Sequence, residues 1–380
     1  MTDTRFIQIH SLQSFPAALL NRDDSGLAKR LPFGGAMRTR VSSQCLKRHW
    51  RVAEDEWSLD KLDAPRSVRS RVVPETRIGA ALREGGIADE ETVEAVVTAF
   101  ARNLYGKDGK DVKSRQALLL GEPEIAYLTR RARDILAEID GPKAAGEAID
   151  ALFKKDEKAN LKALLAANRL NAGLEAALFG RMVTSDPEAN TDAAIHVAHA
   201  FTVHAEETES DYFTVVDDLT RAAGETGAAG IFDTELASGL YYVYVVVDVP
   251  RLIENLGGDD TLAGRVVEHL VHLIATVSPG AKLGSTAPYA FAELMLVETG
   301  RRQPRTLANA FRRPVAPQIP IATDELNDYL KRLDDTYGCA ESRQHLSTEG
   351  RALAGSEGPV NLDSLALFAR DAVHGEHPEA

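Results

Sequence analysis

The apolar run LYYVYVVVDV, at residues 240–249, constrains the fold of this chain more than any other stretch. It consists almost entirely of aromatic and β-branched residues, which is typical of a strand in the middle of a sheet. Its apolar part, Leu240–Val247, is much shorter than the roughly twenty residues that a membrane-spanning helix needs. We therefore predict a central strand and no membrane segment, and the other elements must pair with this strand or cover it.

Three other segments alternate apolar and polar residues as strands do. The segment RFIQIHSL at 5–12 places its isoleucines on one side, which predicts a first strand with one buried face. Alternation returns in IHVAHAFTVH at 195–204, and FAELMLVET at 291–299 predicts a last strand, preceded by a helix at 259–277. This order indicates an α+β fold with a β-α-β-β-α-β core, the ferredoxin-like arrangement of RNA-recognition modules.

The middle of the chain, from about residue 74 to 183, has helical periods rich in alanine, leucine, lysine and glutamate. Glycine and proline divide it into pieces of helix length. We predict a helical insertion at 61–180 within a sheet-based domain made of residues 1–60 and 181–380.

A basic helix is predicted near the N-terminus, beginning at Ser43, which can cap its first turn. The whole chain has 44 basic and 57 acidic residues and a net charge of −13, yet residues 1–51 contain nine lysines and arginines and only three aspartates. An acidic chain repels nucleic acid unless its positive charge is concentrated in one place. At helical spacing the basic face would carry Gln44, Lys47, Arg48 and Arg51, and the opposite apolar stripe Leu46, Trp50, Ala53 and Trp57.

More cations lie just before this helix, beside the pair Gly34-Gly35. Glycine allows a phosphate to approach backbone N–H groups closely, so the cluster indicates binding of phosphates or of an RNA backbone. An ordinary solvated helix face is the alternative interpretation. The cluster comprises Arg22, Lys29, Arg38 and Arg40.

The adjacent carboxylates of Asp23 and Asp24 also permit two interpretations. They could hold Mg²⁺ or act as a general base toward a ribose 2′-OH. The simpler interpretation is a polar turn whose carboxylates neutralise nearby arginines.

The histidines do not predict a metal site. Strand alternation sends His199 to the face opposite His196 and His204, and the pair His269-x-x-His272 lacks the glutamate of an HExxH motif. We expect them to be structural or surface residues, with no metal and no cofactor.

The only two cysteines, Cys45 and Cys339, are far apart in the sequence. They predict no disulfide framework, which favours a reducing compartment such as the cytoplasm. Asp3 and Arg5 stand where a signal peptide would have an apolar run.

A polar segment at about 204–230 is too apolar in places to be a passive linker. It contains Tyr212 and Phe213 among acidic residues, which indicates a projecting hairpin. These aromatic residues either pack locally or contact nucleic-acid bases, and the same two alternatives apply to Met182.

The segment IHSLQSFPAALLNRDDSGLAKRLPFGGAMRTRVSSQCLKRHWR closely resembles the N-terminus of the CasC family, the crRNA-binding backbone subunit of type I-E CRISPR Cascade complexes, within the RAMP superfamily. Further similar segments follow in order: GRMVTS, AIHVAHAFTVHAEETESDYFTVVDDL, SGLYYVYVVVDV, ENLGG, SPGAK and LANAF. The resemblance covers most of the chain and is weakest at about 60–170.

The resemblance implies a non-catalytic scaffold with an RRM-like palm, inserted helical fingers and a thumb at about 204–230. Copies of such a subunit polymerise along crRNA, beside other Cascade subunits, and leave bases exposed to pair with a target DNA strand. By position, the residues implied at RNA phosphates are Arg22, Lys29, Arg40, Ser42, Gln44, Lys47, Arg48 and Arg51; Met182 would lie against bases, and Tyr212, Phe213 and Thr214 of the thumb at an interrupted base pair.

A second function class remains open. Related backbone subunits of type III complexes cut RNA with a loop aspartate, and here Asp23 or Asp24 would be the candidate. The run of type I-E motifs argues against this RNase.

Overall fold

The computed structural model describes residues 4–106, 109, 111–153, 169–182, 190–216, 228–339 and 341–375. The chain divides into two compact units, which we call the sheet unit and the helical unit. The sheet unit comprises Met1–Lys61, His196–Val249 and Ala263–Ala380, and the helical unit comprises Leu62–Ile195 and Pro250–Leu262. The segment Pro250–Leu262 therefore groups with the helices, although sequence periodicity gives no sign of this.

The sheet unit is built on one antiparallel sheet with the strand order β11-β10-β1-β9-β7-β3-β2, and β6 and β8 also pair with β9. Within it, β10-β1-β9-β7 is the order that a β-α-β-β-α-β core requires. The predicted α+β class is confirmed. The strands are β1 (Phe6–Ala18), β2 (Arg30–Phe33), β3 (Ala36–Val41), β6 (Ile195–Val197), β7 (Ala200–Thr202), β8 (Thr208–Val216), β9 (Ala228–Asp248), β10 (Leu294–Gly300) and β11 (Ser342–Ser347).

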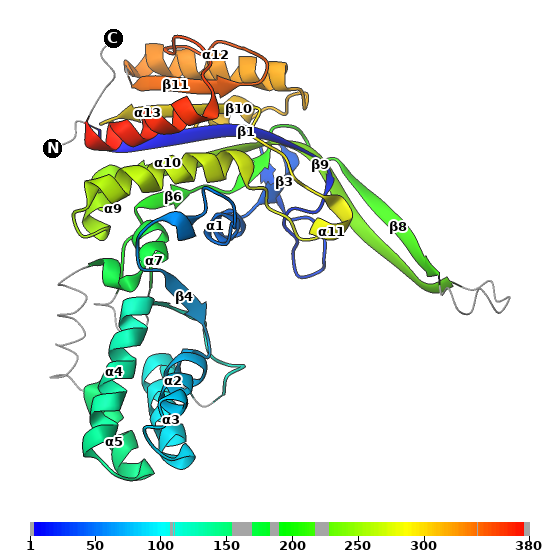
Figure 1. Ribbon diagram of the computed structural model, residues 1–380. Coiled ribbons are helices and arrows are strands. Elements are labelled where there is room, and N and C mark those ends of the chain that lie inside the picture. Colours follow the sequence, from blue (N-terminus) through cyan, green and yellow to red (C-terminus); the bar gives the residue numbers. More distant parts are fainter. Residues whose placement is uncertain are drawn as a thin grey trace. The chain divides into compact units, whose positions relative to one another are not determined.

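The predicted central strand is the second half of β9, which lies between β1 and β7. Tyr241, Tyr242 and Val245 are almost completely buried there. The first half of β9 pairs with β8 instead and extends beyond the sheet as a two-stranded arm (Figure 1). The central strand of the sheet and the second strand of the projecting hairpin are thus one continuous strand, β9.

Helices cover both faces of this sheet. Leu12 of β1 packs in a cluster with residues of α12, whereas the next side chain, Gln13, donates a 2.6 Å hydrogen bond to the carbonyl of Ile274 in α10. Alternate residues of a strand point to opposite faces, so α12 and α10 lie on different sides. The helices and short 3₁₀ turns here are α1 (Ser43–Arg51), η1 (Leu59–Lys61), α10 (Asp260–Thr276), α11 (Leu283–Thr286), η6 (Ala308–Phe311), α12 (Ile319–Tyr337) and α13 (Leu362–His374).

Strand β1 corrects a prediction, because both of its faces are buried rather than one. Gln8 and His10 are 2% and 1% exposed. Gln8 accepts hydrogen bonds from the Tyr244 hydroxyl and the Arg305 backbone, each 2.8 Å long. Polar residues tolerate this burial because each finds a partner.

A buried charge network crosses the sheet beside His10. The carboxylate of Glu298 is bound by Arg343 at 2.7 Å and Arg305 at 2.9 Å, and it lies 3.1 Å from His10. Burial by itself raises the pKa of Glu298, but the hydrogen bonds and positive charges of these partners hold it well below its usual range. Burial lowers the pKa of His10.

The helical unit has its own core, in which apolar residues of four α-helices and one π-helical turn meet. A short sheet of β4 and β5 adjoins these helices. The described elements of the helical unit are β4 (Ser67–Ser70), the π-helical turn η2 (Pro74–Gly79), α2 (Ala80–Glu84), α3 (Glu90–Tyr105), β5 (Leu118–Gly121), α4 (Glu122–Glu138), α5 (Pro142–Leu152), η4 (Arg169–Ala172), α7 (Leu174–Phe179) and most of α9 (Val249–Asn255). Across the described ranges, no helix is both long and apolar enough to cross a lipid bilayer.

Candidate nucleic-acid interface

Helix α1 carries the basic face and is anchored by its apolar side. Leu46 and Trp50 are 4% and 2% exposed, as the apolar stripe predicts. The cap is Ser42 rather than Ser43: its hydroxyl accepts a 3.3 Å hydrogen bond from the Cys45 backbone, and its own backbone N–H is bound by Asn21. The side chain of Ser42 is buried and is therefore occupied in capping.

The predicted apolar stripe is wrong beyond Arg51, where α1 ends. Trp57 lies outside the helix and stacks on His272, with ring centres 3.5 Å apart and planes 2° from parallel. The neighbouring His269 binds the Trp57 carbonyl at 2.9 Å. These two histidines thus hold the segment after α1, a structural role like the one expected for them.

The side chains on the polar face of α1 differ in their exposure to solvent. Gln44 and Arg48 are exposed, whereas Lys47 and Arg51 are half-buried. Burial lowers the pKa of Lys47. Basic groups in the last turn are favoured by the helix dipole, so this end of α1 holds positive charge at little cost.

Three of the predicted cations meet where the chain enters β2 and leaves β3. The Arg40 backbone donates a 2.8 Å hydrogen bond to the carbonyl of Lys29, and Arg22 pairs with Ala28 in an isolated bridge. Arg22 is exposed, and Lys29 and Arg40 are half-buried. The backbone therefore brings these three residues together immediately before α1.

Sequence reasoning missed His199 as a member of this group. The Arg40 guanidinium donates a 2.9 Å hydrogen bond to Nδ1 of His199 and another of 3.1 Å to the carbonyl of Arg30. Burial lowers the pKa of His199, and the positive charges of Arg40 and Lys29 lower it further. A neutral His199 can accept a hydrogen bond from Arg40 and so orients its guanidinium. In the sequence, the only sign that His199 differs from His196 and His204 is its position in the alternating pattern.

Arg38 does not belong to the surface cluster, contrary to the sequence interpretation. It is 0% exposed and donates hydrogen bonds to the carbonyls of Thr202 and Phe311, each 2.9 Å long, and of His204 at 3.2 Å. Burial lowers the pKa of Arg38. The guanidinium joins three segments of the sheet unit and is not accessible to a phosphate.

Gly34 also serves the fold. It has a φ of +62°, and a Cβ there would lie 1.5 Å from the carbonyl oxygen of Arg312. The close backbone approach predicted at the glycine pair is therefore made by the protein itself. Gly35 has a φ of +83° with open space around it.

Asp23 stabilises a turn. Its Oδ1 accepts hydrogen bonds from the backbones of Ser25, at 2.9 Å, and Leu27, at 3.0 Å. Asp24 is exposed. In the described part of the chain, the one group of three potential metal ligands is elsewhere, at Asp334, Cys339 and Glu341, where Arg343 lies within ion-pair distance of both carboxylates.

The predicted thumb residues lie on β8, where Tyr212, Phe213 and Thr214 pair with positions 233, 232 and 231 of β9. Tyr212 is 64% exposed and Phe213 is 40% exposed. The ammonium of Lys282 lies 5.8 Å from the centre of the Phe213 ring. Residues 217–227 of the predicted thumb lie outside the described residues.

Met182 belongs to the helical unit and is 76% exposed. The preceding Arg181 is buried and donates a 2.6 Å hydrogen bond to Glu124. This ion pair fixes the backbone next to Met182 and leaves its side chain at the surface.

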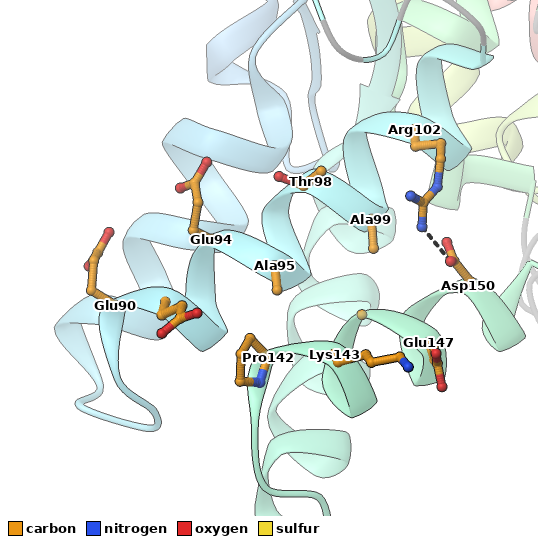
Figure 2. A pocket seen from close by; sticks show the side chains of 12 residues that line it. Glu90, Glu94, Ala95, Thr98, Ala99, Arg102, Pro142, Lys143, Glu147 and Asp150 are labelled. Atoms are coloured by element: carbon orange, nitrogen blue, oxygen red, sulfur yellow. Dashed lines mark hydrogen bonds and ion pairs between the residues drawn. The ribbon is translucent and has the colours of Figure 1, made fainter.

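A cleft of about 740 Å³ between α3 and α5 is a poor nucleic-acid site (Figure 2). Five carboxylates line it, from Glu90, Glu91, Glu94, Glu147 and Asp150, against two cations. One of these cations, Arg102, is paired with Asp150. An acid-lined cleft repels a phosphate backbone.

Comparison with known proteins identifies one matching family and similar solved structures. The CT1975-like protein family matches residues 7–369. A chain of a "CRISPR RNA-guided surveillance complex, pre-nicking" is 27% identical with a TM-score of 0.75, over 97% of this chain and 100% of that chain. A chain of a "CRISPR RNA-guided surveillance complex" is 26% identical with a TM-score of 0.71, over 97% and 99%. No curated protein matches. The chain belongs to the CT1975-like protein family of Cas backbone proteins.

Proposed function

We propose that this protein is a non-catalytic RNA-binding scaffold of a type I-E CRISPR surveillance complex. Copies would lie side by side along the guide RNA, with other complex subunits as partners, and present its bases to a target DNA strand. The similar chains of CRISPR RNA-guided surveillance complexes, matched over nearly their whole length, support a role in such a complex.

The observation that carries RNA binding is the cationic surface formed by α1 and the strand ends before it. Arg48 and Arg22 are exposed, and the Arg40 guanidinium lies 2.9 Å from Nδ1 of His199. Guanidinium groups that are held in place lose little freedom on binding a phosphate. The remainder of the acidic chain disfavours nonspecific coating of nucleic acid.

The β8–β9 hairpin supports the proposed contact with bases or with a neighbouring copy. Its exposed Tyr212 stands on a two-stranded arm, and aromatic faces stack on bases without regard to sequence. Met182, exposed on the helical unit, is proposed as a second apolar contact.

The test is a titration of single-stranded RNA at several salt concentrations with Lys47→Ala/Arg51→Ala. Each lost phosphate contact should flatten the slope of log affinity against log salt by about 0.7, equally for all sequences. Arg351→Ala/Arg370→Ala is the matched control, because it removes two cations that are paired with carboxylates elsewhere on the sheet unit. A loss restricted to particular sequences would contradict backbone recognition.

The non-catalytic part of the proposal is tested separately. End-labelled guide RNA is incubated with the protein and Mg²⁺, with and without a trace of added nuclease. We expect regularly spaced protection and no cutting in the nuclease-free lane. Regular cuts that disappear in Asp23→Ala/Asp24→Ala would make the protein an RNase.

A further inference from the structure

A second cationic site lies on the sheet unit, away from α1. A groove of about 670 Å³ is formed where the chain leaves η6 and passes along α12. Its lining includes three guanidinium groups, one carboxylate, one aromatic ring and one amide. We call it the arginine groove; these groups belong to Arg312, Arg313, Arg332, Glu325, Tyr329 and Asn309.

The three arginines of the groove have no carboxylate partner among the described residues. Elsewhere in the sheet unit, Arg305 and Arg343 bind Glu298, and Arg351 binds Asp324 at 2.7 Å. The groove arginines form no such ion pair, although Glu325 also lines the groove. Its formal charge is +2 in a chain whose net charge is −13.

Neutral groups orient two of these guanidiniums. Arg312 donates a 3.2 Å hydrogen bond to the side-chain oxygen of Asn309. The guanidinium carbon of Arg332 lies 5.6 Å from the centre of the Tyr329 ring. A guanidinium that is oriented but not neutralised keeps its charge available for an external anion.

The groove is rigidly connected to the strands that lead into α1. The turn of the β2–β3 hairpin at Gly34 contacts the carbonyl of Arg312, and Arg38 of β3 donates to the carbonyls of Phe311 and Arg312. The opposite end of this hairpin carries Arg40. A cationic groove at one end and the candidate interface at the other favour a nucleic-acid strand over an acidic protein segment as the ligand.

We propose that the arginine groove binds phosphodiester groups of a nucleic-acid strand, as a second site distinct from the α1 face. Planar guanidinium groups bind phosphate oxygens through paired N–H donors, so two or three converging arginines can hold consecutive phosphates. The shared chemistry is the phosphodiester, and either the guide RNA or a DNA strand can supply it. The choice of a nucleic-acid strand as the ligand rests on the proposed function of α1, whereas phosphate binding by the groove is tested separately from it.

The experiment compares Arg313→Ala/Arg332→Ala with the paired-arginine control Arg351→Ala/Arg370→Ala in the full chain. The probes are an RNA 30-mer of uridine and a DNA 30-mer of thymidine, titrated at several salt concentrations. The groove variant should lower affinity on the order of tenfold and flatten the salt slope by about 0.7 per lost contact. The strand that shows this effect identifies the source of the phosphates. Affinities and slopes equal to those of the control for both strands would overturn the proposal.

A second measurement keeps the result independent of α1. Tripolyphosphate should raise the melting temperature of the wild-type protein and of Lys47→Ala/Arg51→Ala, because a ligand that binds only the folded state stabilises it. The shift should be lost in Arg313→Ala/Arg332→Ala. An equal shift in the groove variant and the control would also overturn the proposal, whereas failure of the α1 face alone would leave this shift in place.

Discussion

Arg343 donates a 2.7 Å hydrogen bond to Glu298 at a point where both side chains are buried, 3% and 0% exposed. Such a pair is not evidence of high stability by itself, because both charges had to leave water. Removing Glu298 is different, because two arginines then lose their completely buried carboxylate partner and keep only Asp334 and Glu341.

Glu298→Gln should therefore destabilise the protein strongly. The substitution leaves Arg305 and Arg343 facing a neutral amide, and a loss of about 3–5 kcal/mol is expected from breaking a buried ion pair. Urea unfolding measures the change. Asp324→Asn removes the exposed partner of Arg351 and should cost less than about 1 kcal/mol. Similar losses for both variants would contradict the role assigned to Glu298.

Arg38→Met should destabilise the sheet unit although it removes a charge from the interior. Methionine fills a similar volume but leaves the carbonyls of Thr202 and Phe311 without their donor, and a buried unsatisfied group costs about 1–3 kcal/mol. Arg38→Lys should rescue little, because an ammonium cannot reproduce the planar fork. Thermal unfolding of Arg38→Met beside Arg40→Met gives the comparison, and a larger loss for Arg40→Met would refute the assignment.

The glycine pair offers a matched test of packing against backbone strain. Both residues have positive φ, so alanine at Gly35 should cost about 1–2 kcal/mol from conformation alone. Alanine at Gly34 adds a collision with the Arg312 carbonyl, which forces the hairpin and η6 apart. Gly34→Ala should unfold at clearly lower urea concentration than Gly35→Ala. Equal midpoints would show that the hairpin turn does not rest on Arg312.

Stability should fall as the pH drops below about 6.5. Burial lowers the pKa of several histidines in the folded state, so the unfolded chain takes up protons first. Their contribution is complete above the unfolded value of 6.5 and is lost as the pH falls through the lower folded values. The free energy of unfolding, measured in urea at pH 7.5, 6.5 and 5.5, should therefore decrease along this series; a constant value would contradict it. The histidines are His10, His199, His204, His272 and His345.

Local patterns predicted the elements well where one period dominates the sequence. The spacing of Leu46 and Trp50 located the buried side of α1, and the aromatic and β-branched run located the centre of the sheet in β9. Both predictions rest on the composition and spacing of nearby side chains, and neither requires the residues that pack against them from distant parts of the chain. The predicted polar face of β1 failed, because the groups that bind Gln8 and His10 come from strands and loops more than 200 residues away.

The candidate site was predictable in composition but not in detail. The concentration of cations before and within α1 is visible in the sequence, yet the separation of Arg38 from Arg40 is not. Both are arginines of one short strand, and only the carbonyls that converge on Arg38 from distant segments decide that it is buried. The arginine groove was missed for the same reason, since only the packing of α12 beside η6 places Arg332 and Arg312 in one groove.

Strand β9 links the exposed β8–β9 arm to the interior of the sheet. Its 21 residues run from the β8–β9 hairpin into the middle of the sheet. At about 3.3 Å per residue, this strand is roughly 70 Å long. A load applied to the exposed arm is therefore transmitted along covalent backbone to buried residues in the middle of the sheet, such as Tyr241 and Val245. The direction of the β8–β9 arm therefore depends on the packing of the core, because one strand belongs to both.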